Sequence, residues 1–286
     1  MRLMSENGNQ ENHNKATFDS ARRAQLQVRA SKRRARGGTP HFIFDRIAQD
    51  MADRLLMINR RFQNALLIAP SGFDTLFRTA LAPDKTPEQI LNTPHEQLGP
   101  ILGDKNGFDL VILCMAHHAE NNPVGLFTAL KERMVDDGHI MTVCFGGETL
   151  SALRTALYST DQAHFDGISP RIHPMIGMQQ NVQLLAHCGF NLTMGDRDRL
   201  NVTYKALSTL TNDLRDMGES YALGAKRALP LGRQYWNDVE TALTSETGQI
   251  KIIYDILWSS GWTPHESQQK PLKPGSGKIH LGDVFT

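Results

Sequence analysis

FDLVILCMAHHAENNPVGLFTALKERMVDDGHIMTVCFGGETLSALR, residues 108–154, carries the strongest signal of the fold. Two runs in it, FDLVILCM (108–115) and HIMTVCF (139–145), are apolar on both faces, as buried parallel strands are. A helical pattern at 124–135 lies between them. Strand, helix and strand in this order indicate a right-handed crossover, and therefore a parallel sheet covered by helices.

The same rhythm continues outward in both directions. A shorter apolar run, ALLIA at 65–69, stops at Pro70 and predicts another buried strand. Helices are expected over 17–36, 42–61, 148–159, 179–187, 205–217 and 230–244, and strands over 200–204 and 250–258. No clear strand is visible between Ala69 and Asp109. We therefore expect one α/β domain.

Length and composition limit the possible classes. The chain has 286 residues, 40% of them hydrophobic, which is enough for one core of about 200 to 250 residues with tails. We expect an N-terminal arm over 1–38, disordered at its start, a domain over 39–270 and an irregular tail over 271–286. No apolar run approaches the roughly 18 residues of a membrane span, so we expect a soluble protein. The cysteines, Cys114, Cys144 and Cys188, lie in apolar surroundings and indicate packed thiols in a reducing compartment rather than a disulfide or zinc site.

A net charge of +1 hides a strongly basic segment near the N-terminus. It contains Arg22, Arg23, Arg29, Lys32, Arg33, Arg34 and Arg36, with no acid after Asp19. Such an arm could contact nucleic acid, an anionic lipid surface or an acidic protein partner, but a solvated helix is the simpler interpretation. It also has the composition of an organelle transit peptide, although Glu6 and Glu11 dilute that signal. We expect a bacterial cytoplasm, with a mitochondrial matrix as the alternative.

Ligands of open parallel sheets bind where the strands end, and three loops follow strand ends here. The first is APSGFDT (69–75), in which Gly72 is the only glycine. Backbone must approach a nucleoside cofactor closely at such a turn, and Pro70 removes an N–H donor. Ala69, Ser71 and Gly72 are the candidate cofactor residues, with a plain strand-to-helix turn as the alternative.

The second and third loops carry polar candidates. His117 and His118 are adjacent and lack the i, i+4 spacing of a helical metal site, so one of them could act as a hydrogen-bonding group or general base, or simply lie partly exposed. The third loop follows 139–145 and contains Gly146, Gly147, Glu148 and, in the helix beyond, Arg154. Glu148 could cap that helix, and Arg154 could reach an acidic substrate or pair with a carboxylate. Trp258 and Trp262 could cover the sheet edge or cap a pocket, but packing in the core is the simpler interpretation. No spaced cluster of metal ligands is visible, so no metal is expected.

The order of short motifs resembles a known family. FDLVILCMAHH, GGETLSALR, GISPRIHP, AHCGF, MGES and GWTPHESQ, together with FDSARRAQLQVRASKRRA at the start, are similar to the methyltransferase-like assembly factors of respiratory complex I and their alphaproteobacterial relatives. Those proteins are similar in turn to the malonyl-carrier-protein methyltransferase of biotin synthesis. The likeness covers most of residues 42–270.

This resemblance implies a class I S-adenosylmethionine-dependent methyltransferase fold, a mostly parallel, seven-stranded sheet with helices on both faces. It places the cofactor at Ala69, Ser71, Gly72 and His118 and matches Gly146, Gly147 and Glu148 to the family motif after the fifth strand. Together with Arg154, these three are the candidate substrate residues. It implies a modifier or assembly factor of complex I that acts on a protein partner or a small acidic substrate, without nucleic acid. Mitochondrial members of the family are linked to arginine hydroxylation.

Two departures from the family pattern leave an alternative open. The Asp-Leu-Gly-x-Gly signature is absent. No strand ending in an acid is visible between Ala69 and Asp109, because the surroundings of Glu88 and Glu96 resemble helix starts or loops. Compared with the family's seven-stranded sheet, the second and third strands are therefore expected to be shortened or lost. The alternative is a non-catalytic assembly or scaffold protein on a decayed methyltransferase fold that no longer binds S-adenosylmethionine.

Overall fold

The structure is a computed structural model. It describes residues 16–37, 41–103, 107–165, 167–224 and 231–269. The start and the tail of the chain, for which we predict disorder and irregular structure, lie outside these residues. Among the described residues, no helix is both long and apolar enough to cross a membrane.

A six-stranded sheet in the order β2-β1-β3-β4-β6-β5 forms the centre of the described structure. The strands are β1 (Asn64–Ile68), β2 (Gln89–Thr93), β3 (Phe108–Cys114), β4 (Met134–Phe145), β5 (Asn191–Tyr204) and β6 (Ile250–Trp262). The first four are parallel, and β6 is inserted antiparallel between β4 and β5. The order reverses between β1 and β3, as in doubly wound folds. This is the strand order of the class I methyltransferase fold with one strand fewer, and the predicted fold class is confirmed apart from that strand.

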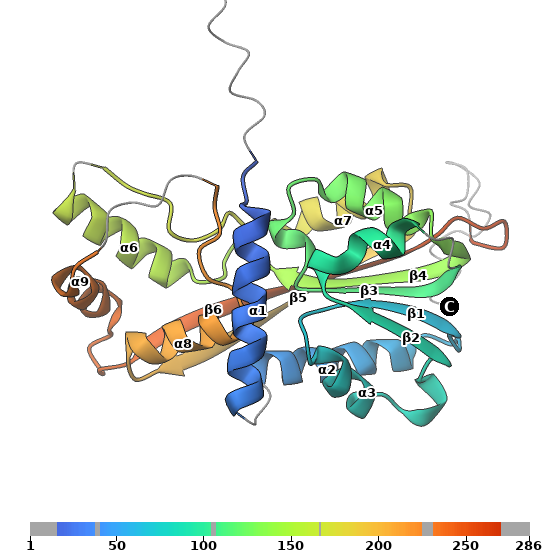
Figure 1. Ribbon diagram of the computed structural model, residues 1–286, viewed down its shortest axis with the longest axis horizontal. Coiled ribbons are helices and arrows are strands. Elements are labelled where there is room, and N and C mark those ends of the chain that lie inside the picture. Colours follow the sequence, from blue (N-terminus) through green and yellow to red (C-terminus); the bar gives the residue numbers. More distant parts are fainter. Residues whose placement is uncertain (1–15, 38–40, 104–106, 166, 225–230, 270–286) are drawn as a thin grey trace, which may run out of the picture.

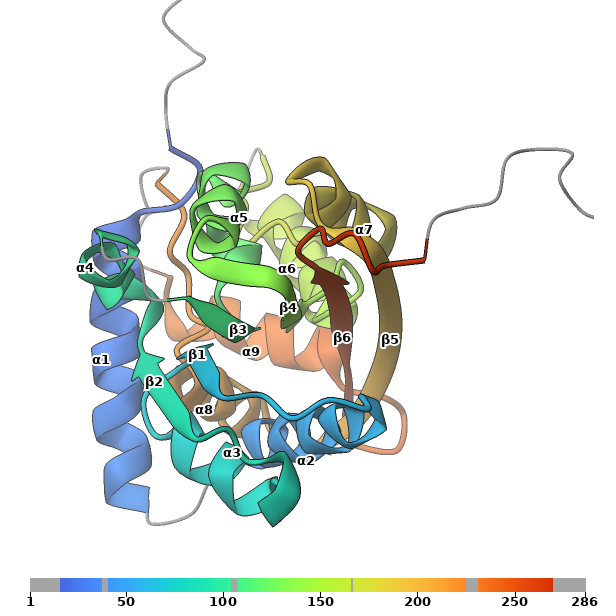
Figure 2. The same ribbon diagram turned by 90° about the vertical axis from the view of Figure 1, so that its right-hand side faces the viewer.

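Helices cover both faces of the sheet, so the fold has three layers (Figure 1). One face carries α4 (Leu98–Gly103), α5 (Pro123–Lys131) and α7 (Met178–His187), and the other carries α2 (Phe42–Met57) and α3 (Phe73–Ala80). Beyond the strand ends lie α6 (Ser151–His164), α8 (Leu207–Met217) and α9 (Arg233–Leu243), and α6 packs on α9. Figure 2 shows the sheet along its strands, with β5 and β6 curving away from β1 and β2.

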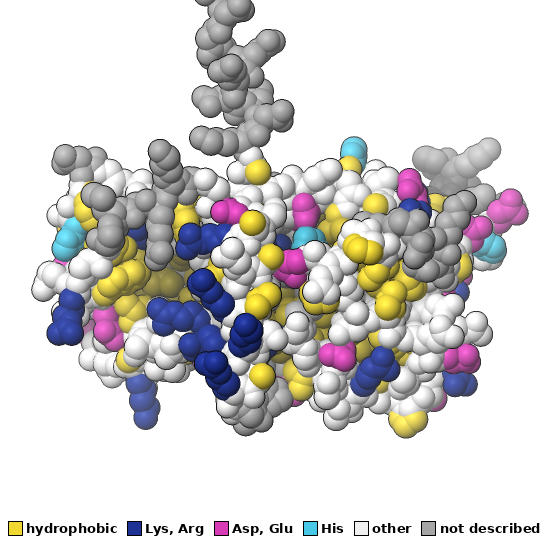
Figure 3. All heavy atoms as spheres, in the orientation of Figure 1, with side chains coloured by type: hydrophobic (Ala, Val, Ile, Leu, Met, Phe, Trp, Pro, Cys, Tyr) yellow, Lys and Arg dark blue, Asp and Glu magenta, His cyan; other side chains and the backbone are white. Residues whose placement is uncertain are grey.

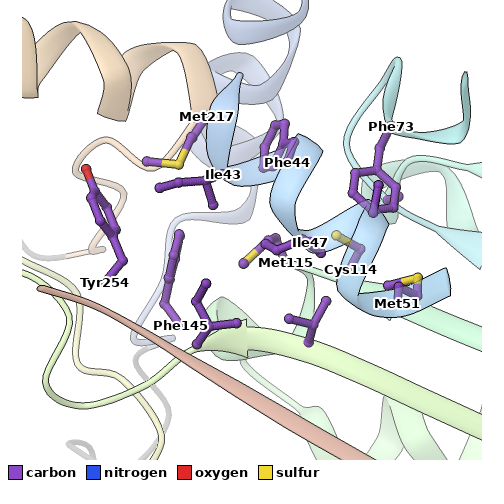
Figure 4. Packing of buried hydrophobic residues seen from close by; sticks show 14 of the residues in the cluster. Ile43, Phe44, Ile47, Met51, Phe73, Cys114, Met115, Phe145, Met217 and Tyr254 are labelled. Carbon is purple, nitrogen blue, oxygen red and sulfur yellow. The ribbon is translucent and has the colours of Figure 1, made fainter. Parts of the chain in front are cut away.

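The larger part of the core lies between the sheet and α2. Apolar residues of α2 recur every three or four positions, and Phe44, Ile47 and Met51 are at most 2% exposed. Figure 4 shows Ile47 beside Met115, the residue that follows β3, and the same cluster of buried residues includes Phe145 at the end of β4. The helix therefore anchors the same strand ends from which the candidate loops depart.

Four strands differ from the sequence predictions. β6 runs to Trp262 rather than ending at residue 258. β2 was missed, because QILNT is short, half exposed and followed directly by Pro94. β4 begins at Met134, inside the segment predicted as helix, because α5 already ends at Lys131. β5 starts at Asn191 rather than near residue 200, since its exposed, charged side chains hide the alternation on which strand prediction depends.

Candidate functional site

The turn after β1 lies where the sequence predicts it, and its single glycine, Gly72, has a left-handed backbone conformation. Gly72 has φ +84°, a left-handed value, and precedes the first turn of α3. Ser71 and Gly72 are exposed, whereas Ala69 and Pro70 are buried. The turn therefore presents a small exposed side chain and main chain where β1 ends.

A cavity of about 310 Å³ borders this turn, and we name it the β1–β3 cavity. Its lining includes Ala69 and Ser71 after β1, Glu96 after β2, and Met115 after β3. It lies beside the point where the strand order reverses, which is where doubly wound sheets bind their ligands. Gly72 lines a neighbouring cavity of about 370 Å³ that shares Ser71. The side chains of the turn thus leave open space beside it.

Glu96 is a candidate residue that sequence reasoning set aside. Because β2 was not recognised, Glu96 was assigned to a loop without a strand before it. In the structure β2 ends at Thr93, and Glu96 follows it with an exposed side chain on the β1–β3 cavity. The carboxylate that the family places at the end of the second strand therefore has a candidate here.

The basic helix α1 (Ser20–Gly37) forms the wall of this cavity opposite the strands. Its Arg23 is only 6% exposed and donates hydrogen bonds to the carbonyl oxygens of Met115, Ala116 and Ala119 at 2.8 to 3.2 Å. Figure 1 shows α1 lying across the ends of β1, β2 and β3. The helix predicted at 17–36 is confirmed, and it packs against the loop after β3. The predicted domain boundary after residue 38 stays a prediction.

Other basic side chains of α1 divide between internal contacts and the surface. Arg34 donates to the carbonyl oxygen of Ser71 at 2.9 Å, and Arg33 pairs with Asp216 of α8. Arg29, Lys32 and Arg36 are exposed. Figure 3 shows Lys and Arg side chains gathered on this face of the molecule. The helix therefore keeps a basic outer surface while its inner surface holds the strand ends.

The two histidines after β3 are buried, not partly exposed as the simpler interpretation expected. His117 is 3% exposed, and its Nε2 lies 2.8 Å from Oδ1 of Asn181. Burial lowers the pKa of His117 to about 3. His118 is 5% exposed, and its Nε2 lies 3.0 Å from Oε2 of Glu219. Neither side chain lines the β1–β3 cavity.

Four motifs that are far apart in the sequence meet in one buried polar cluster. It consists of Arg23, His118, His173 and Glu219, from the basic helix, the HH loop, the RIHP segment and the MGES segment. Burial works to raise the pKa of the Glu219 carboxyl, but His118, Arg23 and His173 outweigh it and lower this pKa to about 2. His173 accepts a hydrogen bond from the Ala222 N–H at 2.8 Å. The cluster joins α1 to the ends of β3 and α8.

The GGET loop after β4 is fastened to the antiparallel strands. Gly146 donates to the carbonyl oxygen of Asp255 at 2.7 Å, and Thr149 bonds to the same residue. A side chain at position 146 would meet Asp255 Oδ2 and Leu257 Cγ, each at 2.6 Å. The predicted substrate residue Glu148 turns to β5, where its Oε1 lies 2.9 Å from Arg197 and 2.8 Å from Arg199. Gly146 therefore allows close packing of the loop on β6, and Glu148 forms ion pairs with β5.

Gly147 and Arg154 line a different, larger cavity of about 740 Å³, which we name the Arg154 cavity. Tyr158, Met175 and His173 also line it. Arg154 donates to the carbonyl oxygens of Gly147 and Thr149 at 3.2 and 3.3 Å and makes no ion pair with any described residue. His173 thus belongs both to the buried cluster and to this cavity. Among the described residues, no group of three or more His, Cys, Asp or Glu could hold a metal ion.

No protein-family model matches the chain. Similar sequences are found among curated proteins. Arginine-hydroxylase NDUFAF5 of Rattus norvegicus is 31% identical over 184 residues, 63% of this chain and 53% of the relative. Its counterpart in Danio rerio is 30% identical over 188 residues, 63% and 57% of the two chains. A malonyl-[acyl-carrier protein] O-methyltransferase of Laribacter hongkongensis is 24% identical over 175 residues, 60% and 57% of the two chains.

The chain spans about half the length of the curated relatives that it matches. Among solved structures, the YcgJ protein of Bacillus subtilis aligns with a TM-score of 0.47 at 10% identity, over 77% of this chain and 99% of that chain. The strand order, not this overlay, places the chain in its fold class. The resemblance found in the sequence is confirmed: the chain is similar in sequence to the mitochondrial arginine-hydroxylase NDUFAF5 proteins and, at lower identity, to a malonyl-[acyl-carrier protein] O-methyltransferase.

Proposed function

We propose that this chain is an S-adenosylmethionine-binding, methyltransferase-like protein that modifies or helps to assemble a protein partner linked to respiratory complex I. The β1–β3 cavity is the observation that carries the proposal. It lies at the strand ends where this fold class binds its cofactor, and its volume of about 310 Å³ is at the lower end of ligand sites.

The residues present fit the cofactor. Ser71 and the main chain of the turn would hold its amino-acid end, and the exposed Glu96 carboxylate would accept hydrogen bonds from hydroxyl groups. Met115 and Ala69 supply apolar walls. When bound, S-adenosylmethionine supplies an electrophilic methyl group; the protein's own residues bind, orient and exclude water.

The Arg154 cavity is the proposed substrate side. Arg154 is the cation in it without a carboxylate partner among the described residues, so it would hold an acidic group. Tyr158 and Met175 provide apolar surface beside it. His173 links this cavity to the buried cluster beneath α1, and through it to the wall of the β1–β3 cavity.

Titration calorimetry with S-adenosylmethionine and S-adenosylhomocysteine tests the proposal. Ala24→Trp places a large ring on the α1 wall of the β1–β3 cavity, whereas Ala21→Trp changes an exposed position of the same helix that does not line it. We expect binding to the wild type and to Ala21→Trp, and at least about tenfold weaker binding to Ala24→Trp. Absence of heat at millimolar ligand with folded wild-type protein would refute the proposal.

A second candidate is a non-catalytic assembly protein on the same fold. Two observations favour it: Pro70 offers no N–H at the turn, and Arg34 already occupies the carbonyl oxygen of Ser71. The exposed basic residues Arg29, Lys32 and Arg36 would then contact an acidic protein partner. A pull-down whose partner is lost when these three are changed to Gln, while calorimetry shows no cofactor, would favour this candidate over the first.

The cellular compartment of the protein has the two alternatives that the sequence left open, a bacterial cytoplasm and a mitochondrial matrix. The relatives named NDUFAF5 are described as mitochondrial. We propose a bacterial cytoplasm for this chain, with the mitochondrial matrix as the alternative. Cell fractionation followed by immunodetection distinguishes the two compartments.

A further inference from the structure

A further cavity lies beyond the end of β4, between α6 and α8, and its volume is about 260 Å³. Phe145, the last residue of β4, and Tyr254 of β6 contribute to its wall. The cavity shares three residues with the Arg154 cavity, but Arg154 itself does not line it. We name it the α6–α8 cavity. The cofactor and substrate sites proposed above leave it unassigned.

Leucine side chains from the two helices supply much of the wall. Leu153 and Leu157 are one turn apart on α6, and Leu207 and Leu214 are two turns apart on α8. Residues at these spacings lie on one side of a helix, so each helix turns an apolar side to the cavity. Leu150, which precedes α6, adds to the same surface. Branched aliphatic walls of this kind suit a hydrocarbon chain.

Part of this apolar surface is accessible from outside. Leu214 and Ile172 are half-buried, and Trp236 of α9 is 40% exposed. All three residues line the cavity. Figure 3 shows a hollow with hydrophobic side chains in it on this face of the molecule, with Lys and Arg side chains beside it. An apolar group that enters the hollow would exchange water for aliphatic and indole surface.

Three arginines also line the cavity, and the balance of charge there is positive. Arg171 is paired with Asp161 at 2.6 Å, whereas Arg22 of α1 and Arg215 of α8 form no ion pair with any described residue. Glu219 is the one acidic residue among the described lining residues, and its carboxylate is already engaged in the buried polar cluster. An anion is therefore the ligand charge that this cavity favours.

The guanidinium groups of Arg22 and Arg215 keep N–H donors that a ligand can reach. The side chain of Arg22 donates from Nε to the carbonyl oxygen of Tyr221 at 2.7 Å, and its Nη atoms have no acceptor among the described residues. Those Nη atoms are not among the fully buried atoms without a partner, so solvent reaches them. Arg215 is exposed and donates from Nη1 to Oδ1 of Asn212 at 3.2 Å. A guanidinium has five N–H donors, so most of them stay available on each residue.

These observations together define the chemical class of the ligand. A guanidinium fork matches a carboxylate, which accepts two parallel hydrogen bonds from it. The leucine walls suit an aliphatic chain attached to that carboxylate. The volume of about 260 Å³ lies just below the range of about 300 to 1,000 Å³ for ligand pockets, so the chain is short.

We propose that the α6–α8 cavity binds a small amphipathic acid, whose aliphatic chain lies between α6 and α8 and whose carboxylate is held by Arg22 and Arg215. No residue that lines the β1–β3 cavity also lines this one, so the proposal does not depend on the proposed cofactor function.

The fluorescence of Trp236 reports on the cavity. Of the three tryptophans, Trp258 and Trp262 do not line it, and Trp258 is 2% exposed in the core. Octanoate is the probe, 1-octanol has the same chain without the charge, and acetate has the carboxylate without the chain. Octanoate added to the full chain should shift the emission of Trp236 to shorter wavelength and saturate, with a Kd below about 1 mM.

The two control compounds separate the contributions of the head and the chain. 1-Octanol should bind roughly tenfold more weakly than octanoate, because it lacks the charge-assisted hydrogen bonds. Acetate should leave the emission unchanged, because it has no chain to bury beside the indole.

Four variants locate the ligand. Trp236→Phe should abolish the shift while calorimetry still detects octanoate. Arg215→Gln should weaken octanoate about tenfold, whereas Arg29→Gln on the exposed side of α1 and Arg154→Gln in the neighbouring cavity should leave its Kd unchanged. The proposal is overturned if about 5 mM octanoate gives no saturable shift, if 1-octanol binds as tightly, or if Arg154→Gln weakens octanoate as much as Arg215→Gln does.

Discussion

Replacing Gly146 by alanine should destabilise the protein, whereas replacing Gly147 by alanine should not. The two glycines are adjacent in the loop after β4, and both were predicted to contact substrate. A Cβ at position 146 would approach Asp255 Oδ2 at 2.6 Å and two Leu257 atoms at 2.6 and 2.8 Å. A Cβ at position 147 would meet nothing within 4 Å.

The neighbours of Gly146 have little room to give way. Asp255 is 1% exposed, and its two carboxylate oxygens accept hydrogen bonds from Arg197 at 2.6 and 2.9 Å. Leu257 is also 1% exposed. Overpacking of this kind costs about 1 to 3 kcal/mol. Alanine at position 147 should change the free energy of unfolding by less than about 0.5 kcal/mol, or stabilise slightly by restricting the unfolded chain.

Urea unfolding of the two variants and the wild type, followed by far-UV circular dichroism, measures the difference. For a chain of this size, 1 kcal/mol also corresponds to a shift in Tm of about 2 to 4 °C. We expect Gly146→Ala to lie at least about 1 kcal/mol below Gly147→Ala. Equal stability of the two variants would refute the packing role of Gly146 and return it to the candidate substrate residues.

Two further predictions concern the buried polar cluster and its surroundings. Arg23→Met should destabilise the protein by about 2 kcal/mol or more, because three carbonyl oxygens lose their donor and Glu219 loses a neighbouring cation. Arg29→Met, at an exposed position, should leave the free energy of unfolding almost unchanged. Urea unfolding compares the two variants. The pKa of His117 is about 3 in the folded chain and near 6.5 in the unfolded chain, so only the unfolded chain takes up this proton as the pH falls from 6.5 towards 3, and stability falls with it. Between pH 7 and pH 5 this proton uptake lowers the wild type's free energy of unfolding by up to about 2 kcal/mol. His117→Gln should lose correspondingly less stability between the same two pH values, measured by urea unfolding. Equal losses in the variant and the wild type would contradict the low pKa of His117.

Long apolar runs made most of the fold predictable. β1, β3 and the core of β4 were recognised because both of their faces are buried, and α2 because its apolar residues recur at helical spacing. β2 is an outer strand with exposed positions, and its five residues carry too few apolar side chains to stand out. The first part of β5 is an edge with charges alternating in sign, whose partners lie on β6 and α2 and are far away in sequence.

The sequence predicted which loops border cavities, but not how the side chains of the candidate residues are oriented. Ala69, Ser71, Gly147 and Arg154 do line cavities, because strand ends determine where loops begin. Glu148 turned to Arg197 and Arg199, and His118 turned to Glu219; both pairings depend on tertiary contacts that no local pattern contains. The role of Arg23 was equally hidden, since a buried arginine and an exposed one look alike in a basic helix.

The most direct test of the central claim is a crystal structure of the protein soaked with S-adenosylhomocysteine. We expect density for the nucleoside and amino-acid parts in the β1–β3 cavity, between Ser71 and Met115, with a hydroxyl group near the Glu96 carboxylate. Density at another place, or an empty β1–β3 cavity at saturating ligand, would contradict it.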